Sequence, residues 1–260
     1  MKCVCNLQVL NLPGNNLSKV SPTVFGLAIS KLRTANLSDT AISADMFNNL
    51  FHVMANETRD MKLCHLNIAH NSALKHVDPD LLSEAIIKLE SVNMNMTSAT
   101  ATQISSLIKL SSTQDYPRLR EVNMSGVSAL SKVDHLLLSS FVLSLSSATL
   151  YSTKLSPTQL IAILTSIINT NQPLTLHHLD LGGSNFSSLS PSLISSAVNK
   201  IPSVNLFFTK LTTNQQVEIL QQACSQSRLE CLDISGNLRN IPPSLLSEAK
   251  NNIRDLVFDA

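Results

Sequence analysis

The sequence has 260 residues, of which 43% are hydrophobic and only 14% carry a charge. Its 19 basic and 18 acidic residues give a formal net charge of +1. This balance argues against a protein built to hold nucleic acid or to lie on an anionic membrane, because both need an excess of basic side chains. No stretch approaches the roughly 20 consecutive apolar residues of a membrane-spanning helix, so we expect no insertion into a bilayer.

The first stretch with a clear pattern runs from Leu7 to Leu17 and reads LQVLNLPGNNL. It matches the leucine-rich repeat template L-x-x-L-x-L-x-x-N-x-L at every position, with Asn15 as the asparagine. Such a segment predicts a short strand that sends Leu10 and Leu12 into the core, followed by a turn and a helical return. Successive strands of this kind stack in parallel about 4.8 Å apart.

The same pattern recurs along the rest of the chain, with short and long units in alternation. The true period is therefore a pair of units that spans 53 to 57 residues. We expect a single repeat array over residues 1–260, with nine full repeats and a truncated tenth. We also expect a fragment of a longer protein, or a chain that caps itself by pairing, because an uncapped solenoid end exposes apolar core surface. The repeats start at Leu7, Leu32, Leu63, Leu89, Leu119, Leu145, Leu176, Ile201, Leu229 and Ile253.

The turn after each predicted strand mostly carries a short polar residue, and its type depends on the unit. Side chains of this size can hydrogen-bond backbone groups that the turn leaves unpaired, and a column of them can do so from unit to unit. Odd-numbered units carry Asn15, Asn71, Val127, Ser184 and Asn237 at this position, and even-numbered units carry Thr40, Thr97, Thr153 and Thr209.

The helical returns also differ between the two unit types. In odd units Pro follows Ser21, Asp78 and Ser190, a pattern typical of an N-cap residue before the first helical position. Even units have longer helices with capping-box spacing, as in Ser156–Gln159 and Thr212–Gln215. In the helix after Ser156, an apolar stripe predicts packing against the sheet. Its members are Leu160, Ile161, Leu164, Ile167 and Ile168.

A parallel strand joined to the next by a helix, with paired unit types, resembles the ribonuclease-inhibitor-like class of leucine-rich repeats. The resemblance covers Leu7 to Ala260 and implies an α/β leucine-rich repeat solenoid, a horseshoe with a parallel concave sheet and helices on the convex side. That class often has Cys where this chain has Thr, which indicates a divergent branch. Its members include the inhibitor, the sensing regions of immune receptors and the activator of the Ran GTPase, so the motif is specific for fold rather than for function.

The open face of the sheet follows from the register. The mid-strand column is Asn11, Asn36, Asn67, Asn93, Asn123, Thr149, Asp180, Asn205, Asp233 and Val257, and the column before it is Val9, Thr34, His65, Ser91, Glu121, Ser147, His178, Ser203, Cys231 and Asp255. One hypothesis makes the asparagines structural, because stacked side-chain amides can hydrogen-bond to each other. The other makes the C-terminal half a contact surface, because interfaces concentrate aromatic anchors with flanking charge. Its candidate residues are Tyr151, His178, Asp180, Asn205, Phe207 and Asp233, and Phe208 either joins them or folds into the following loop.

Neither a metal centre nor an active site is predicted, and we expect no cofactor. Cys64, His65, His70 and His76 suggest a metal site, but Cys64 and His65 are adjacent on a strand and so point to opposite sides, and His76 lies beyond the turn. A catalytic set of Ser203, His178 and Asp180 can be named. Nothing around these three residues resembles a nucleophile elbow, and polar neighbours are common on a Ser-rich sheet.

We therefore expect a non-enzymatic, cytoplasmic module that binds an unidentified protein partner on its concave face, as in an intracellular immune receptor or a regulatory scaffold. One alternative is a GTPase activator of the Ran-activator type, which would present Arg33, Arg120 or Arg239. The other is an extracellular receptor ectodomain, favoured by the CxC of Cys3 and Cys5 and by six N-x-S/T sequons. Two of those sequons lie within predicted strands, where a glycan would collide with neighbouring repeats.

Overall fold

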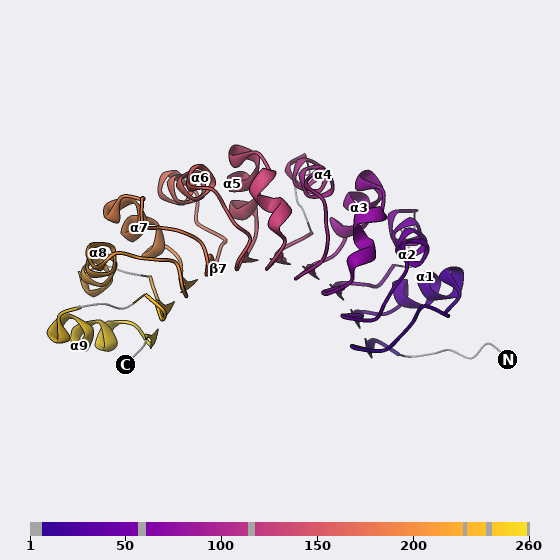
Figure 1. The fold of residues 1–260 in the computed structure, drawn as a ribbon, viewed down its shortest axis with the longest axis horizontal. Helices are drawn as coiled ribbons and strands as arrows, with labels where there is room; N and C mark the ends of the chain where they lie inside the picture. Colours follow the sequence, from indigo (N-terminus) through magenta and orange to yellow (C-terminus); the bar gives the residue numbers. More distant parts are fainter. Residues whose placement is uncertain (1–6, 57–60, 114–117, 226–227, 238–240, 259–260) are drawn as a thin grey trace. The chain divides into compact units, whose positions relative to one another are not determined.

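A computed structural model describes residues 7–56, 61–113, 118–225, 228–237 and 241–258 of the chain. Short strands and helices alternate along it, and within each part the helices lie on one side of the strands (Figure 1). The chain divides into two compact units, Met1–Asn123 and Met124–Ala260. Unit 1 and unit 2 always mean these two parts of the chain, whereas odd units and even units always mean the odd- and even-numbered repeats. Each unit is described by itself.

Unit 1 contains five of the described strands and unit 2 the other five. The elements of unit 1 are β1 (Val9–Asn11), α1 (Pro22–Ser30), β2 (Thr34–Asn36), α2 (Ala44–Asn56), β3 (His65–Asn67), the 3-10 helix η1 (Ser72–His76), α3 (Pro79–Ile86), β4 (Ser91–Asn93), α4 (Ala101–Ser112) and β5 (Glu121–Asn123). The elements of unit 2 are η2 (Ser128–Lys132), α5 (His135–Ser144), β6 (Ser147–Thr149), α6 (Pro157–Asn169), β7 (His178–Asp180), α7 (Pro191–Val198), β8 (Ser203–Asn205), α8 (Thr213–Ser225), β9 (Cys231–Asp233), α9 (Pro243–Asn252) and β10 (Asp255–Val257).

Within each unit, neighbouring strands pair in parallel and in the register that the sequence predicts. Asn11 is opposite Asn36, and the column continues through the asparagines of β3, β4 and β5. In unit 2 the corresponding column runs from Thr149 to Val257. Every strand begins two residues after a predicted repeat start, from Val9 after Leu7 to Asp255 after Ile253.

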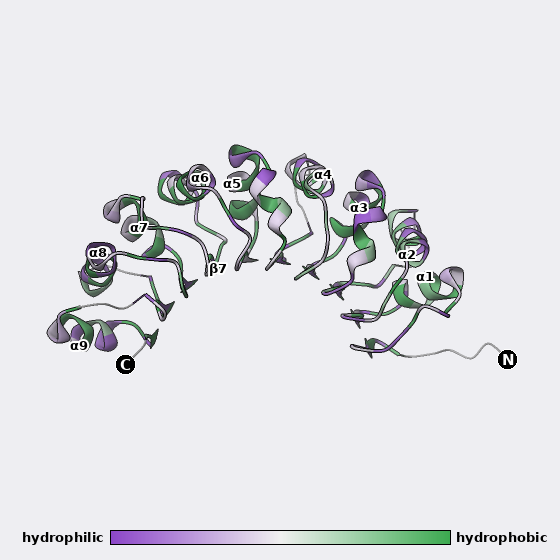
Figure 2. Cartoon of the chain, in the orientation of Figure 1, coloured by the Kyte–Doolittle hydropathy of each residue, from purple (hydrophilic) through white to green (hydrophobic). Residues whose placement is uncertain are grey.

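The core lies between the strands and the helices. In unit 1 the inward residues Leu37, Leu66 and Ile68 pack there with Phe47 and Phe51, whose rings stack 5.6 Å apart. Figure 2 shows that most helices have hydrophobic and hydrophilic sides, as elements with one buried face do. In α6 the predicted apolar stripe is wrong at one position. Leu160, Leu164 and Ile167 are buried, Ile168 is half-buried, and Ile161 is 44% exposed because Ile163 takes the place on the buried face.

The predicted alternation of helix lengths is confirmed. Helices of odd units have 8 to 10 residues and helices of even units have 12 or 13. The predicted N-caps are in place, but only Asp78 accepts hydrogen bonds with its side chain, from the N–H groups of Asp80 and Leu81. Both predicted capping boxes are present as reciprocal hydrogen bonds, at Ser156–Gln159 and at Thr212–Gln215.

One glutamine in each of three even units has a second role that joins it to the unit before. The side-chain amide of Gln159 is buried and donates to the carbonyl oxygens of Leu130 (3.0 Å) and Val133 (2.7 Å). Gln103 does the same in unit 1, toward Leu74 and Val77, and Gln215 toward Phe186 and Leu189. The capping glutamine thus fixes the loop of the preceding odd unit, which gives the paired module a physical basis.

The turn column behaves as predicted where it carries Thr or buried Asn. The hydroxyl of each even-unit Thr donates to the carbonyl oxygen three residues before it, at 2.6 to 2.8 Å. The buried amide of Asn237 donates to the carbonyl oxygens of Leu206 (2.7 Å), Ile234 and Ser235. Two odd units depart from this pattern: Val127 is a buried apolar residue, and the buried Ser184 hydroxyl has no hydrogen-bond partner among the described residues.

Candidate functional site

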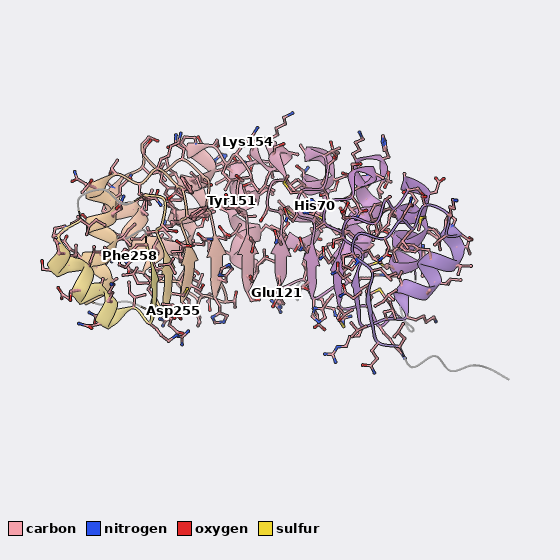
Figure 3. All side chains as sticks on the ribbon, turned by 60° about the horizontal axis from the view of Figure 1, so that its bottom comes forward. His70, Glu121, Tyr151, Lys154, Asp255 and Phe258 are labelled. Atoms are coloured by element: carbon pink, nitrogen blue, oxygen red, sulfur yellow. The ribbon has the colours of Figure 1, made fainter. Side chains whose placement is uncertain are left out.

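The candidate residues lie on the face of the unit 2 strands opposite the helices. His178 and Asp180 lie on β7, Asn205 on β8 and Asp233 on β9. Tyr151 comes two residues after the end of β6. In Figure 3, which shows all side chains, Tyr151 lies at the end of its strand and Lys154 lies farther out, on the turn that follows. The parallel register brings the residues on β7, β8 and β9 side by side.

Three aromatic side chains form a continuous group at the ends of these strands, here called the aromatic strip: Tyr151, Phe207 and Phe208. The rings of Tyr151 and Phe207 stack with centroids 6.3 Å apart, and Phe207 meets Phe208 edge to face at 4.5 Å. Tyr151 and Phe207 are half-buried, whereas Phe208 is 58% exposed. Unit 1 carries Ser38 and Asn95 at the positions of Tyr151 and Phe207, so the strip belongs to unit 2.

Two glycines make room for the strip. A Cβ atom on Gly182 would lie 2.8 Å from Cδ2 of Tyr151 and 3.1 Å from the carbonyl oxygen of Phe207. One on Gly236 would lie 2.8 to 3.0 Å from three ring atoms of Phe208. Because β7 lies between β6 and β8, the missing side chain of Gly182 allows the two rings to approach each other.

Phe208 adopts a backbone conformation that aromatic residues rarely take. Its φ is 52°, in the left-handed region, which costs an ordinary L-residue roughly 1 to 2 kcal/mol. The repeat itself requires a left-handed residue here, because Asp39, Met96 and Ser152 at the equivalent even-unit positions share it. The conformation is therefore a property of the repeat, and what distinguishes Phe208 is an exposed aromatic ring at this position.

The carboxyl group of Asp180 is more enclosed than the sequence suggests. The residue is only 8% exposed, and its Oδ1 accepts the N–H of Gly182 at 2.8 Å. Burial raises the pKa of Asp180 above its ordinary value, and the nearby carboxylate of Asp233 adds to that, while the Gly182 N–H, His178 and the Asn205 side chain act in the opposite direction. Register alone predicts an exposed carboxylate, whereas the structure largely buries Asp180 and hydrogen-bonds its carboxyl group to the side chain of Asn205 on the neighbouring β8.

Asn205 and Asp233 are half-buried, and each accepts a backbone N–H two residues on. Asn205 Oδ1 accepts the N–H of Phe207 at 2.8 Å, and Asp233 Oδ1 accepts both the N–H (2.9 Å) and the hydroxyl (2.6 Å) of Ser235. The same bond recurs in unit 1, where Asn67 and Asn93 accept at 3.0 and 2.9 Å. The asparagine column is therefore structural mainly through its turns, and amide-to-amide bonding is seen between Asn36 and Asn11 at 2.8 Å.

His178 contacts Ser203 rather than Asp180. Its Nδ1 lies 2.9 Å from the hydroxyl oxygen of Ser203, and no hydrogen bond between described side chains joins it to Asp180. The same pair occurs in unit 1, where Nδ1 of His65 lies 3.0 Å from the hydroxyl of Ser91. A contact repeated at equivalent strand positions is explained by the sheet and does not supply a nucleophile with an oriented base.

A second polar cluster lies at the strand beginnings of unit 1. Arg118 forms an ion pair with Glu90 (3.1 Å) and donates to the sulfur of Cys64 (3.0 Å). Its hydrogen bond is the main cause that lowers the pKa of Glu90. His65 Nε2 lies 3.9 Å from Glu90. Over the part of the chain that the structure describes, no three His, Cys, Asp or Glu side chains gather closely enough to hold a metal ion.

The arginines and cysteines named as alternatives in the sequence lie partly inside and partly outside the described residues. Arg33 and Arg120 directly precede β2 and β5 and are exposed. Arg239 and the CxC of Cys3 and Cys5 lie outside the described residues. The three described cysteines, Cys64, Cys224 and Cys231, are free thiols. Among the described helices, none has both the length and the apolar content needed to cross a bilayer.

Sequence reasoning missed two parts of the site. It left open whether Phe208 is exposed, and it did not include Gly182 among the candidate residues. A signal for the close approach at Gly182 was present in the 56-residue spacing: Phe207 and Tyr151 are 56 positions apart, and the odd unit between them has Gly182 where other odd units have Ala69, Ser125 or Ser235. A glycine at a position that elsewhere carries a side chain indicates a close approach.

The parallel strands, asparagine or threonine turns and returning helices define a leucine-rich repeat fold. The family profile described as Leucine Rich Repeat matches residues 6–27, and no curated protein matches the sequence. The leucine-rich repeat-containing protein LegL7 from Legionella pneumophila is similar in structure, with a TM-score of 0.50 and 17% identity over 95% of this chain and 90% of LegL7. The mouse RP105/MD-1 complex gives a TM-score of 0.47 and 17% identity over 97% of this chain and 42% of the mouse chain. The chain is a leucine-rich repeat solenoid, a fold that commonly serves protein interaction and is typically non-enzymatic.

Proposed function

We propose that this chain binds a protein partner through the strand face of unit 2, with the aromatic strip as its anchor. The observation that carries the proposal is the group of three touching rings, of which Phe208 is 58% exposed in a left-handed conformation. Aromatic side chains supply a disproportionate share of interface energy. The leucine-rich repeat fold offers a broad sheet on which such anchors are held rigidly.

The strip has the arrangement of an interface anchor rather than of a core cluster. Tyr151 and Phe207 are half-buried and fixed by each other, by the turn at Gly182 and by the hydrogen bond from Phe207 to Asn205. Rings that are already ordered lose little conformational entropy when a partner covers them. Polar groups surround the strip, with Asp180 and Asp233 on the strand side and Lys154 on the loop side, as a polar rim surrounds the apolar centre of an interface.

The proposed setting is that of a regulatory scaffold or of the recognition region of an intracellular immune receptor, in the cytoplasm. The proposal is supported by a formal net charge of only +1, by the free thiols of Cys64, Cys224 and Cys231, and by a fold used in such recognition regions. An extracellular location is the second choice. A Ran-type GTPase activator remains a prediction from the sequence without a structural observation that favours it.

The test is capture by the full chain from cells of its source, followed by binding measurements with the purified partner. We expect the double variant Phe207→Ala/Phe208→Ala to weaken partner binding at least tenfold, because removal of a central aromatic anchor typically costs about 2 kcal/mol. The matched control is Asn95→Ala/Met96→Ala, which changes the equivalent positions of unit 1 and should leave binding unchanged. Retained binding by the strip variant, with a native circular dichroism spectrum, would contradict the proposal.

A further inference from the structure

We infer that the partner segment held by this face presents an arginine side chain, with its guanidinium group between the carboxylates of Asp180 and Asp233 and its stem along the aromatic strip. This inference rests on the proposed function and adds the chemistry of the ligand to it. It comes from two independent features of unit 2, the carboxylates of the mid-strand column and the rings beside them.

Neither carboxylate takes part in an ion pair between described residues. Asp180 and Asp233 lie on β7 and β9 and flank Asn205 on β8. No ion pair within 4.0 Å between described residues includes either of them. Arg254, a cation on the neighbouring β9–β10 edge, is already paired with Glu230 (3.3 Å) and Asp255 (3.0 Å).

The surroundings of Asp180 disfavour its ionised form, and a cation beside the carboxylate would stabilise that form. It is 8% exposed, and both burial and the charge of Asp233 disfavour its ionised form. The groups that favour ionisation are the Gly182 N–H, the Asn205 side chain and His178, which is itself engaged with Ser203. A charge that is taken out of water and is only partly compensated gains from a cationic partner that arrives with its own hydrogen-bond donors.

The geometry favours arginine over lysine. A planar guanidinium carries five donors in a fixed fork, so it can donate to acceptors on neighbouring strands at the same time, here the carboxyl groups of Asp180 and Asp233 on the strands that flank β8. The same group stacks on aromatic faces, which the strip supplies at the ends of the same strands. A lysine ammonium is a compact point charge that reaches one carboxylate at a time.

The loop side of the strip limits the orientation of the partner. Lys154 and Lys210 are exposed on the turns that follow Tyr151 and Phe208, and Lys154 projects beyond Tyr151 in Figure 3. A basic group placed over these turns would be repelled, whereas a basic group over the strands would be attracted. The face therefore selects one basic side chain in a defined position rather than a strongly basic segment.

The experiment measures binding of four pools of fluorescein-labelled 12-residue peptides to the full chain by fluorescence anisotropy. The central residue is fixed as Arg, Lys, citrulline or Glu, and the other positions are randomised among uncharged residues. We expect the Arg pool to bind about tenfold more tightly than the citrulline pool, which has the same shape without the charge. The Lys pool should lie between them, and the Glu pool should bind most weakly.

Variants connect this preference to the proposed groups. Asp233→Asn and Asp180→Asn/Asp233→Asn keep the shape and remove the charge, and each should reduce the preference for Arg over citrulline at least fivefold. Phe207→Ala/Phe208→Ala should weaken binding of the Arg pool, and Glu121→Gln, a carboxylate change on the strand face of unit 1, should change nothing. Thermal unfolding of each variant verifies that it is folded.

Equal binding of Arg and citrulline pools, tightest binding of the Glu pool, no binding of any pool, or an Arg preference unchanged in Asp233→Asn would each overturn the inference. None of these results bears on the proposed function. That function is tested separately, by whether Phe207→Ala/Phe208→Ala loses the captured partner. Conversely, an Arg preference that depends on Asp233 but survives removal of the strip would overturn the placement of the arginine stem on the aromatic rings.

Discussion

The side-chain amide nitrogen of Asn71 lies 2.8 Å from the carbonyl oxygen of Leu37, which belongs to the preceding repeat. The same amide donates to Ile68 and Ala69 in its own repeat, and its oxygen accepts the N–H of Thr40 at 3.3 Å. In unit 2 the amide of Asn237 likewise donates to the carbonyl oxygen of Leu206 in the preceding repeat, and its oxygen accepts the N–H of Leu211 there. One asparagine in an odd unit thus closes two turns at once, its own and that of the even unit before it.

We expect Asn71→Ala to lower the free energy of unfolding by about 2 to 4 kcal/mol, because it leaves several buried backbone groups without a partner. Chemical denaturation followed by circular dichroism measures the change. Asn15→Ala is the control: Asn15 is exposed and its amide donates only to Leu12 and Pro13 of its own repeat, so the change should stay within about 1 kcal/mol. Equal losses in the two variants would show that the contact between repeats contributes nothing.

The double role of Gln159 leads to a prediction that separates its two sets of bonds. Gln159→Glu keeps the oxygen that accepts the N–H of Ser156 but replaces the amide donor to Leu130 and Val133 by a buried oxygen facing two carbonyl oxygens. We expect a loss of about 3 kcal/mol or more, at least as large as that of Gln159→Ala. Glu is otherwise a good capping-box residue, so a capping role alone predicts no loss.

The denaturation midpoint of both variants decides this point, and Gln221→Ala on the exposed side of α8 serves as the control with an expected change within about 0.5 kcal/mol. A Gln159→Glu protein as stable as the unmodified chain would mean that the bonds to Leu130 and Val133 are dispensable.

Features that depend on local sequence were predictable. The strand positions, the capping box at Ser156 and the turn role of Asn71 follow from spacing within one repeat, because strand alternation and helix capping act over a few residues. The repeat period then transfers each assignment along the chain. This is why the register of the mid-strand column, from Asn11 to Asn123 in unit 1, is confirmed throughout that unit.

Features that depend on neighbouring strands were not predictable from spacing. The burial of Asp180 depends on side chains one repeat away, such as Asn205, and the ring of Phe208 lies where a side chain at Gly236 would clash with it. The exposure of Ile161 has a related cause, since a run of apolar residues in α6 does not by itself tell which of them face the sheet. Contacts between repeats therefore decide the candidate site.

The burial of Asp180 predicts a pH dependence of stability. Between the unfolded pKa of about 3.9 and the raised pKa of the folded state, the folded chain keeps a proton that the unfolded chain releases. Asp180 therefore lowers the free energy of unfolding as the pH rises through this interval, and it causes no further change above the folded pKa. Asp180→Asn, which can still accept the Gly182 N–H, should be more stable than the unmodified chain at pH 7, with the difference vanishing toward pH 3.

Asp134→Asn provides a control of opposite sign. Hydrogen bonds from the N–H groups of Leu137 and Leu136 at the start of α5 lower the pKa of Asp134. Its carboxylate therefore stabilises the fold above the ordinary aspartate pKa and loses that effect as the pH falls. This variant should be the less stable one at pH 7 and equal to the unmodified chain in acid. Thermal unfolding between pH 3 and pH 7 tests both, and an Asp180→Asn curve parallel to that of the unmodified chain would contradict the role of burial.

Gly182→Ala tests whether the close approach under Tyr151 shapes the binding face. The backbone accepts a side chain here, since Ala69 and Ser235 occupy the same position in other odd units, so stability should change by less than about 1 kcal/mol. The added Cβ, 2.8 Å from Tyr151 Cδ2, must displace the ring, and we expect partner affinity to fall about three- to tenfold, as for a partly lost aromatic anchor. In a double-mutant cycle, Gly182→Ala should have no further effect once Tyr151→Ala is present, because the displaced ring is gone. An effect of the same size in both backgrounds would place the cause in the β7 turn instead of in the position of Tyr151.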